Sequence, residues 1–211
     1  QKKLAEDLLK SGVTIADTSR IDIRGDIKIG QNSFVDINNV FEGKNVLGKN
    51  VHIGPNCYIS NCSIKDNTVV YANTVLEDSV IGKNCKIGPF ARIRGGSELT
   101  EGAELGNFVE SNRSNIGKNS KAKHLTYLGD ARLGTKVNVG AGTITCNYDG
   151  KNKHKTIIAD GTFIGSNSSL VAPLVLGENS YTGAGSVITK DVHKGKLAVA
   201  RVKQVNLKRK N

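Results

Sequence analysis

Residues 81–105 read Ile81-Gly-Lys-Asn-Cys-Lys-Ile87-Gly-Pro-Phe-Ala-Arg-Ile93-Arg-Gly-Gly-Ser-Glu-Leu99-Thr-Glu-Gly-Ala-Glu-Leu105. An aliphatic residue stands at every sixth position, and a glycine or another small residue often follows it. A period of six fits neither the 3.6-residue turn of an α-helix nor the alternation of a flat sheet, but it fits short strands joined by tight turns. The stretch therefore predicts a solenoid in which each hexad forms one side of a triangular coil.

The same period continues on both sides of this stretch, from about residue 27 onward. Further aliphatic residues in phase are Leu47, Ile53, Ile59, Ile116, Ile158, Ile164, Leu170 and Leu176. Five-residue steps from Ile59 to Ile64 and from Leu128 to Leu133 interrupt the count. Coils of about 18 residues stacked at about 4.8 Å give roughly nine coils. The pattern predicts an all-β chain folded as a parallel β-helix.

Some segments break the hexads and suggest boundaries. Residues 1–11 are charged and amphipathic, which predicts a short helical linker or cap, and residues 12–195 form the predicted β-helix. Residues 143–156 cannot be fitted to hexads and are predicted to leave the coil as a loop. Residues 196–211 are predicted to form a basic C-terminal arm.

Composition narrows the class of protein. The chain of 211 residues is 37% hydrophobic and carries a net charge of +11, which suits anionic ligands such as phosphates. Only 5% of residues are aromatic, and none is tryptophan, so no stacking platform accompanies the basic residues and nucleic-acid binding is not expected. No run of apolar residues is long enough to cross a membrane. We expect a cytoplasmic protein without a membrane partner.

The cysteines and histidines do not predict a metal centre. Four cysteines lack a C-x-x-C spacing, so we expect reduced thiols in place of a zinc site or a disulfide framework. The four histidines are not spaced to converge from neighbouring coils. We therefore expect no metal in this chain.

Chemistry-bearing residues concentrate in three non-repeating motifs. They are Gly88-Pro-Phe-Ala-Arg-Ile-Arg94, His124-Leu-Thr-Tyr-Leu-Gly-Asp130 and Asn138-Val-Gly-Ala-Gly-Thr-Ile-Thr-Cys-Asn-Tyr-Asp-Gly150. These motifs resemble the C-terminal acetyltransferase domain of the bifunctional bacterial GlmU family, and the resemblance covers essentially the whole chain. The resemblance implies the left-handed parallel β-helix of hexapeptide-repeat proteins, whereas general rules for parallel crossovers would favour the other hand.

The resemblance also implies an activity. Members of this family transfer acetyl from acetyl-CoA to glucosamine-1-phosphate, and a second domain uridylylates the product to UDP-N-acetylglucosamine for peptidoglycan and lipopolysaccharide. The chain is expected to form a homotrimer with clefts between subunits. The uridylyltransferase half is expected to be missing here, and magnesium is expected only for that half. A catalytically silent trimerisation scaffold is the alternative from another class.

Site residues follow from the resemblance position by position. His124 corresponds to the catalytic base, and a histidine suits deprotonation of an amine near neutral pH. The sugar phosphate is expected to bind Arg94, Tyr127, Asn138 and Lys153. The expected acetyl-CoA contacts are Ala141, Asn147, Tyr148, Ser166, Ala184 and Arg201. Backbone N–H groups of residues 140–142 or the Asn147 amide are candidates to stabilise the developing oxyanion.

One position departs from the family pattern. After Gly106-Asn-Phe-Val-Glu110 the family continues with an aliphatic residue and two lysines, the first of which contacts the sugar ligand. This chain has Ser111, Asn112 and Arg113 there. Either Arg113 replaces the missing cation, or the sugar binds more weakly, or the acceptor is a different amino sugar. Asn112→Lys is expected to lower the apparent KM for glucosamine-1-phosphate.

Overall fold

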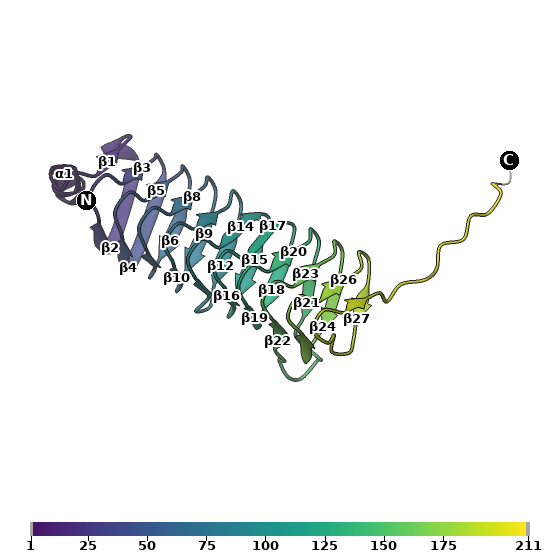
Figure 1. Cartoon of the computed structure of the whole chain (residues 1–211). Helices are drawn as coiled ribbons and strands as arrows, with labels where there is room; N and C mark the ends of the chain where they lie inside the picture. Colours follow the sequence, from purple (N-terminus) through teal and green to yellow (C-terminus); the bar gives the residue numbers. More distant parts are fainter. Residues whose placement is uncertain (1, 210–211) are drawn as a thin grey trace.

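The structure, a computed structural model, describes residues 2–209 and is a three-sided β-helix with one helix at its N-terminal end (Figure 1). Gln1, Lys210 and Asn211 of the predicted segments 1–11 and 196–211 lie outside the described residues. Helix α1 (Lys2–Lys10) buries Ala5 and Leu8. It contacts β1 and β2 and covers the first coil, as a cap would.

The prism has three faces, and the strands within each face are parallel. Face 1 consists of β1 (Thr14–Ile15), β3 (Phe34–Val35), β5 (His52–Ile53), β8 (Val69–Val70), β11 (Lys86–Ile87), β14 (Glu104–Asn107), β17 (Lys121–His124), β20 (Asn138–Val139), β23 (Phe163–Ile164), β26 (Tyr181–Thr182) and β28 (Leu197–Ala198). Face 2 consists of β6 (Tyr58–Ser60), β9 (Val75–Glu77), β12 (Arg92–Arg94), β15 (Glu110–Asn112), β18 (Tyr127–Gly129), β21 (Ile144–Cys146), β24 (Ser169–Val171) and β27 (Val187–Ile188).

Face 3 completes each coil. It consists of β7 (Ser63–Ile64), β10 (Val80–Ile81), β13 (Glu98–Leu99), β16 (Asn115–Ile116), β19 (Ala131–Leu133), β22 (Thr156–Ile158) and β25 (Leu174–Leu176). In the first two coils β2 (Ile21–Ile29), which follows the 3₁₀ turn η1 (Thr18–Arg20), and β4 (Asn39–Leu47) run along faces 2 and 3 without a break. The predicted parallel β-helix is confirmed.

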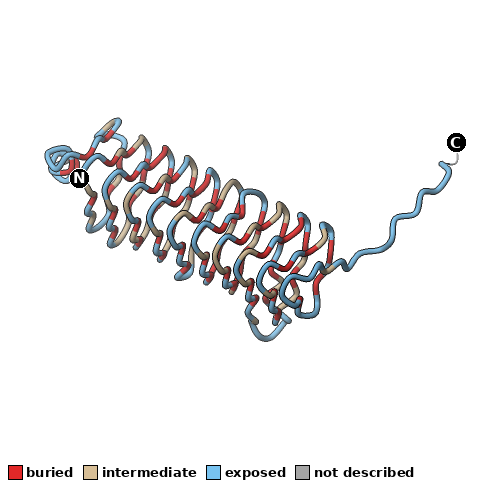
Figure 2. The backbone as a smooth tube through the Cα atoms, in the orientation of Figure 1, coloured by how far each residue is buried: buried red, intermediate tan, exposed pale blue. Residues whose placement is uncertain are grey.

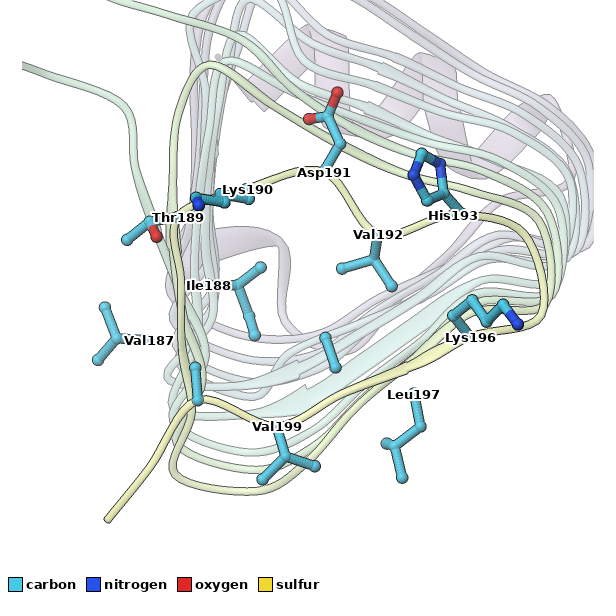
Figure 3. Close-up of a pocket in the computed structure, with 12 residues that line it drawn as sticks. Val187, Ile188, Thr189, Lys190, Asp191, Val192, His193, Lys196, Leu197 and Val199 are labelled. Atoms are coloured by element: carbon cyan, nitrogen blue, oxygen red, sulfur yellow. The ribbon is translucent and has the colours of Figure 1, made fainter.

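The helix winds left-handed. Viewed along its axis from the C-terminal end, the chain runs clockwise from Val187 through Asp191 and His193 to Leu197 while it approaches the viewer (Figure 3). A right-handed coil would recede under the same rotation. The hand is the one that the family resemblance implies, and it is opposite to the usual crossover preference.

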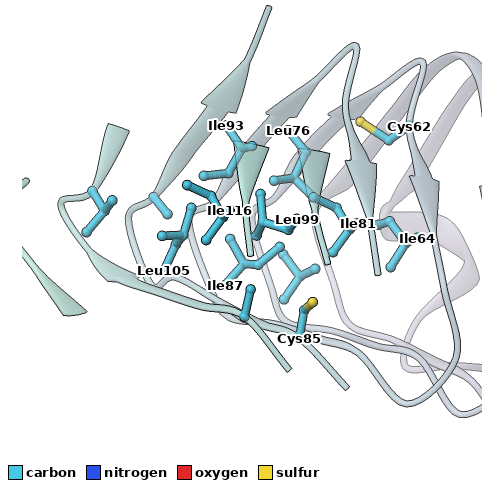
Figure 4. Close-up of a cluster of buried hydrophobic side chains, with 14 of the residues drawn as sticks. Cys62, Ile64, Leu76, Ile81, Cys85, Ile87, Ile93, Leu99, Leu105 and Ile116 are labelled. Atoms are coloured by element: carbon cyan, nitrogen blue, oxygen red, sulfur yellow. The ribbon is translucent and has the colours of Figure 1, made fainter. Parts of the chain in front are cut away.

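The hexad aliphatic residues fill the interior. Ile81, Ile87, Ile93 and Leu105 are buried and stack on their equivalents in neighbouring coils (Figure 4). Each fully buried side chain of this kind contributes about 1.5–3 kcal/mol. Buried residues recur along the coils between intermediate and exposed ones (Figure 2). Each coil packs only against the coil before it and the coil after it, so each is stabilised mainly by these two neighbours.

The cysteines are free thiols, as expected. Cys57, Cys62 and Cys85 are buried, whereas Cys146 is partly exposed. Burial raises the pKa of Cys57, Cys62 and Cys85 to about 11, so these three remain protonated at neutral pH. Their role is packing.

Corners require residues that tolerate a left-handed backbone or close approach. Asn38, Asn56 and Asn73 occupy one such corner in successive coils, each with φ +59°. Asparagine adopts this conformation more readily than other non-glycine residues. At Gly106 the limit is space, because a Cβ there would lie 2.1 Å from the Lys123 carbonyl oxygen. The asparagine and glycine residues of the regular coils therefore stand where the corner backbone requires them.

Two predicted boundaries differ from the structure. Residues 144–146 of the predicted loop 143–156 form β21, because Thr145 turns inward and is buried. The excursion is thus residues 147–155, before β22. Strand β28 pairs with β26 inside the predicted arm 196–211, so the last rung extends past residue 195. Beyond it, the described part of the arm projects away from the prism (Figure 1).

The C-terminal end of the prism is open. A cavity of about 370 Å³ lies there, and Ile188 and Val192 point into it (Figure 3). None of the predicted site residues lines this cavity. No helix within residues 2–209 has the length and apolar character needed to cross a bilayer.

Candidate active site

His124 lies at the corner between faces 1 and 2, at the end of β17. Its Nδ1 lies 2.7 Å from Oδ1 of Asn107, its register partner in the previous coil. An amide oxygen only accepts, so Nδ1 carries a proton, and in the neutral ring Nε2 then holds the lone pair. The ring is exposed. His124 is thus held in the tautomer that a general base requires.

A groove of about 300 Å³ adjoins His124. Tyr71, Lys86, Gly88, Glu104, Gly106, Asn107, Lys123 and His124 line it. Glu104 and Lys123 form a 2.7 Å ion pair on its wall, and this lysine lowers the pKa of the Glu104 carboxyl. The groove gives a small polar ligand access to the imidazole from face 1.

Small side chains continue the line of His124 toward the C-terminal end. The strand registers place Ala141, Ser166 and Ala184 below His124 in three successive coils. Hydrogen bonds from Asn167 N to Ala141 O and from Gly185 N to Ser166 O confirm this stacking. Rungs are about 4.8 Å apart, so the row forms a narrow track about 15 Å long.

Arg201 stands at the far end of this track. Its Nη1 donates a 2.6 Å hydrogen bond to the carbonyl oxygen of Ala184. The cation therefore lies just past the final rung, where it can meet an anionic group of a ligand that follows the track. We call Asn107, His124, Ala141, Ser166, Ala184 and Arg201 the histidine row.

A second group of predicted residues lies at the other end of the face 2 strands. Arg94 ends β12 and binds Glu110, with Nε 2.8 Å and Nη2 2.7 Å from the same carboxylate oxygen. Asn112 is its register partner in the next coil and is only 3% exposed. Arg113 Nη1 lies 3.2 Å from Asn112 Oδ1. A cation therefore adjoins position 112 even without a lysine there.

Asp130 links this group to the loop. Its carboxylate accepts from Arg113 Nε at 2.8 Å and Nη2 at 2.9 Å, and from Asn147 Nδ2 at 2.5 Å. These contacts, above all the hydrogen bond from Arg113, lower the pKa of Asp130 below its usual value. Tyr127 lies beside the same cluster, since a Cβ added to Gly129 would be 2.5 Å from its hydroxyl and 2.7 Å from Asn147 Nδ2.

Loop 147–155 carries Tyr148 and Lys153. The two form an isolated antiparallel bridge, and both side chains are exposed. Asp149 closes the loop by accepting from the backbone of Lys151 and Asn152 and from His154 Nε2 at 2.7 Å. Hydrogen bonds from the loop backbone and from His154 lower the pKa of Asp149. The loop is therefore an ordered turn that presents Lys153.

A single chain does not bring all predicted residues together. The histidine row occupies the corner where face 2 begins, while Arg94, Asn112, Arg113 and loop 147–155 occupy the corner where it ends. Asn138 lies apart from both corners, at the start of β20 on face 1. Among residues 2–209, no cluster of three or more His, Cys, Asp or Glu side chains is arranged to hold a metal ion.

The sequence did not predict three residues that contact the candidate site residues. Asn107, Glu110 and Asp130 orient His124, Arg94 and Asn147, respectively. All three stand inside quoted motifs, but a partner one coil away is recognised only when the exact coil length is known. The register between neighbouring coils is the information that the motifs alone do not contain.

The fold and the motifs can now be compared with known proteins. The family profile named GMPPB C-terminal domain matches residues 23–147, and the bacterial transferase hexapeptide profile matches residues 155–190. The chain belongs to the GMPPB C-terminal domain family. It is 54% identical over 207 residues to the bifunctional protein GlmU of Marinobacter nauticus and 56% identical over 206 residues to that of a Marinomonas species.

The resemblance to GlmU is thus confirmed. Each of these alignments covers 98% of this chain and 46% of the relative, so the chain spans about half the length of the curated relatives it matches. Among solved structures, the UDP-N-acetylglucosamine acyltransferase of Francisella novicida superposes with a TM-score of 0.59 at 18% identity, covering 89% of this chain and 67% of that one. LpxA of Bacteroides fragilis superposes with a TM-score of 0.56 at 18% identity, covering 85% and 66%. At this identity the two structures support the fold alone.

Proposed function

We propose that the chain transfers acetyl from acetyl-CoA to the amine of glucosamine-1-phosphate, giving N-acetylglucosamine-1-phosphate for UDP-N-acetylglucosamine and cell-wall synthesis. The observation that carries the proposal is the histidine row, in which a base of fixed tautomer stands at the head of a track of small residues that ends at a cation. Whole-chain similarity to GlmU proteins supports this substrate pair.

Chemistry at the row starts at His124. Nε2 removes a proton from the sugar ammonium or from the attacking amine, while Asn107 accepts from Nδ1–H and stabilises the imidazolium that forms. The thioester supplies the activated acetyl group. Negative charge develops on its carbonyl oxygen. Of the backbone N–H groups of residues 140–142, that of Ala141 is the candidate to stabilise it, because Gly140 N donates to Ile164 O and Gly142 N donates to His124 O. Thiolate of CoA leaves as the amide bond forms.

The residues present fit acetyl-CoA. Ala141, Ser166 and Ala184 leave room for a pantetheine chain along the corner, and Arg201 offers a charged donor at the end of the track. Asn147 and Tyr148 are the further proposed contacts from the loop. The domain needs no metal in this scheme.

The sugar phosphate requires the second group. Arg94 uses two of its five N–H donors on Glu110, which leaves donors for a phosphate, and Lys153 is exposed. Tyr127, at the start of β18, and Asn138 complete the proposed set. Because this group lies at the opposite corner from His124, we place each site between two copies of a homotrimer. One copy supplies the base and its neighbour supplies the phosphate contacts.

Release of CoA thiol from acetyl-CoA with glucosamine-1-phosphate tests the proposal. His124→Ala should lower kcat about 10²–10⁴-fold, the usual range for loss of a general base. His52→Ala is the matched control, because His52 is another face 1 histidine whose ring stacks on Phe34 away from the row. Activity that persists in His124→Ala would overturn the assignment.

A different amino sugar is the second candidate acceptor, because Asn112 stands where the family has a sugar-contacting lysine. A panel of amino sugars, with and without phosphate, separates the two. Asn112→Lys should lower the apparent KM for glucosamine-1-phosphate if a phosphate contact is missing. Faster turnover of another amine by the wild type would favour the second acceptor.

A further inference from the structure

Asp130 forms the centre of a three-residue cluster with Arg113 and Asn147, and neither Asp130 nor Arg113 has a role in the scheme above. Arg113 engages both of its carboxylate oxygens at 2.8 and 2.9 Å, and Asn147 donates to Oδ2. This is a two-point ion pair with a shared acceptor, a geometry that fixes direction as well as distance. The three residues come from two successive coils and the loop.

The cluster determines how Asn147 is presented. Asn147 is 7% exposed, and only its amide nitrogen can donate to a carboxylate, so the amide has one orientation. Its backbone oxygen accepts from His154 N at 2.8 Å. Asn147 is therefore held at its side chain by Asp130 and at its backbone by the far end of the loop.

The backbone at this corner supports a specific role. Arg113 and Asp130 adopt φ +52° and +48°, whereas Gly43, Asn61 and Gly95 occupy the same corner in other coils. A left-handed backbone costs a long side chain about 1–2 kcal/mol relative to the right-handed region. Local conformation therefore gives no reason for arginine here, but its contact with Asp130 does.

We propose that Asp130 is a positioning residue that fixes Asn147, and with it loop 147–155, for acetyl transfer, and that Arg113 is the clamp that orients Asp130. The proposal deepens the function proposed above and depends on it. In this arrangement the cation of Arg113 serves the protein's own carboxylate and acts on substrate only through Asn147. Position 112 then needs no lysine to keep the loop in place.

A double-mutant cycle tests the link between Asp130 and Asn147. Asp130→Ala should lower kcat/KM for acetyl-CoA about tenfold, as loss of an orienting partner does. In an Asn147→Ala background the same substitution should change kcat/KM by less than about twofold, because the two act as one unit. An equal loss in both backgrounds would overturn the proposal.

Arg113 and a surface ion pair provide the matched variants. Arg113→Lys keeps the charge but not the two-point geometry, so it should recover only part of the loss seen in Arg113→Ala. Glu101→Gln breaks the exposed 2.8 Å pair with Lys118 and should leave the kinetics unchanged. Full activity in Arg113→Ala would show that Arg113 is not needed to orient Asp130.

Limited proteolysis gives a readout that does not require activity. Trypsin cleavage after Lys151, Lys153 and Lys155, followed by mass spectrometry, reports opening of the loop. Cleavage should be about fivefold faster in Asp130→Ala than in wild type and unchanged in Glu101→Gln. Equal cleavage in Asp130→Ala and wild type would overturn the positioning role. Absence of CoA release by the wild type would instead reject the proposed function, while the proteolysis result still judges the loop contact.

Discussion

The same corner of the prism carries different residues in two regions. In the early coils it holds Asn38, Asn56 and Asn73 at φ +59°. In the coils around His124 it holds Phe90, Phe108 and Leu125 at φ 56°, 57° and 50°. The backbone is nearly identical, but asparagine suits it and bulky apolar residues do not.

Exposure makes the contrast sharper. Phe90, Phe108 and Leu125, which we call the apolar ladder, are 50%, 55% and 61% exposed, and the two phenyl rings stack at 5.3 Å. Each ladder residue directly follows Pro89, Asn107 or His124. A strained backbone and exposed apolar surface both reduce the stability of an isolated chain. The difference teaches that this corner suits a surface covered by a second copy of the proposed homotrimer, next to His124, whereas the asparagine corner suits the backbone of the coil itself.

Converting the ladder to asparagine should give the largest effect. Phe90→Asn, Phe108→Asn and Leu125→Asn together should relax the backbone while removing about 1 kcal/mol of association free energy per side chain. We expect dissociation of the proposed homotrimer and loss of the proposed acetyltransferase activity with a correctly folded chain, measured by analytical ultracentrifugation and CoA release. Asn56→Ala is the control, since it alters the asparagine corner and should leave assembly intact. An unchanged trimer in the triple variant would show that the ladder is not covered.

Removing the partner of His124 should have the next largest effect. Asn107→Ala leaves Nδ1–H without its acceptor, so the imidazole loses its fixed orientation and kcat should fall about tenfold. Asn107→Asp places a negative charge there and should move the acidic limb of the pH–rate profile to higher pH. Pro55→Ala is the control, because Pro55 precedes Asn56 in an early coil as Asn107 precedes Phe108. An unaltered kcat in Asn107→Ala would show that the hydrogen bond to Asn107 is not needed to orient His124.

The opposite corner predicts a smaller, pH-dependent effect. The pKa of Asp130 is lowered in the folded state, mainly by Arg113, so its carboxylate stabilises the fold above the unfolded pKa of about 3.9. That stabilisation is lost as the pH falls through the folded pKa. The Tm difference between wild type and Asp130→Asn should therefore be full at pH 7 and shrink below about pH 4. The shrinkage should weaken in an Arg113→Ala background, and a Tm difference independent of pH would contradict the ion pair.

Thiol labelling should distinguish the two regions by the accessibility of their cysteines. Cys57 and Cys62 in the early coils and Cys85 beside them are buried with pKa values of about 11, whereas Cys146 next to the loop is partly exposed. Iodoacetamide at pH 8 should therefore modify Cys146 first and the other three only after unfolding. Early modification of Cys57 would show that the coils open locally.

The fold was predictable because the hexad period determines which residues point inward. Ile81, Ile87 and Ile93 are buried as the pattern required. Ser111 and Thr145 also point inward, and their polarity hid the strands that contain them. The predicted loop therefore includes residues 144–146, which form β21. Period alone gives no signal where a small hydroxyl replaces an aliphatic residue.

The site was predictable only in part. The motifs named His124, Arg94 and Asn147, but the partners that orient them stand 16 or 17 residues away along the chain. A slip of one residue in coil length changes which side chains meet, and both five-residue steps alter that length. Contacts between rungs therefore emerge from the register and not from the motif.

The open C-terminal end has a consequence for how the molecule comes apart. Four strands of face 1, β20, β23, β26 and β28, separate the strand of His124 from that end. In a nearest-neighbour stack, terminal rungs fray at a smaller free-energy cost than central ones. Ser166 and Ala184 belong to the rungs that would melt first. On heating, the rungs proposed to hold acetyl-CoA would therefore lose their structure before His124 loses its contact with Asn107.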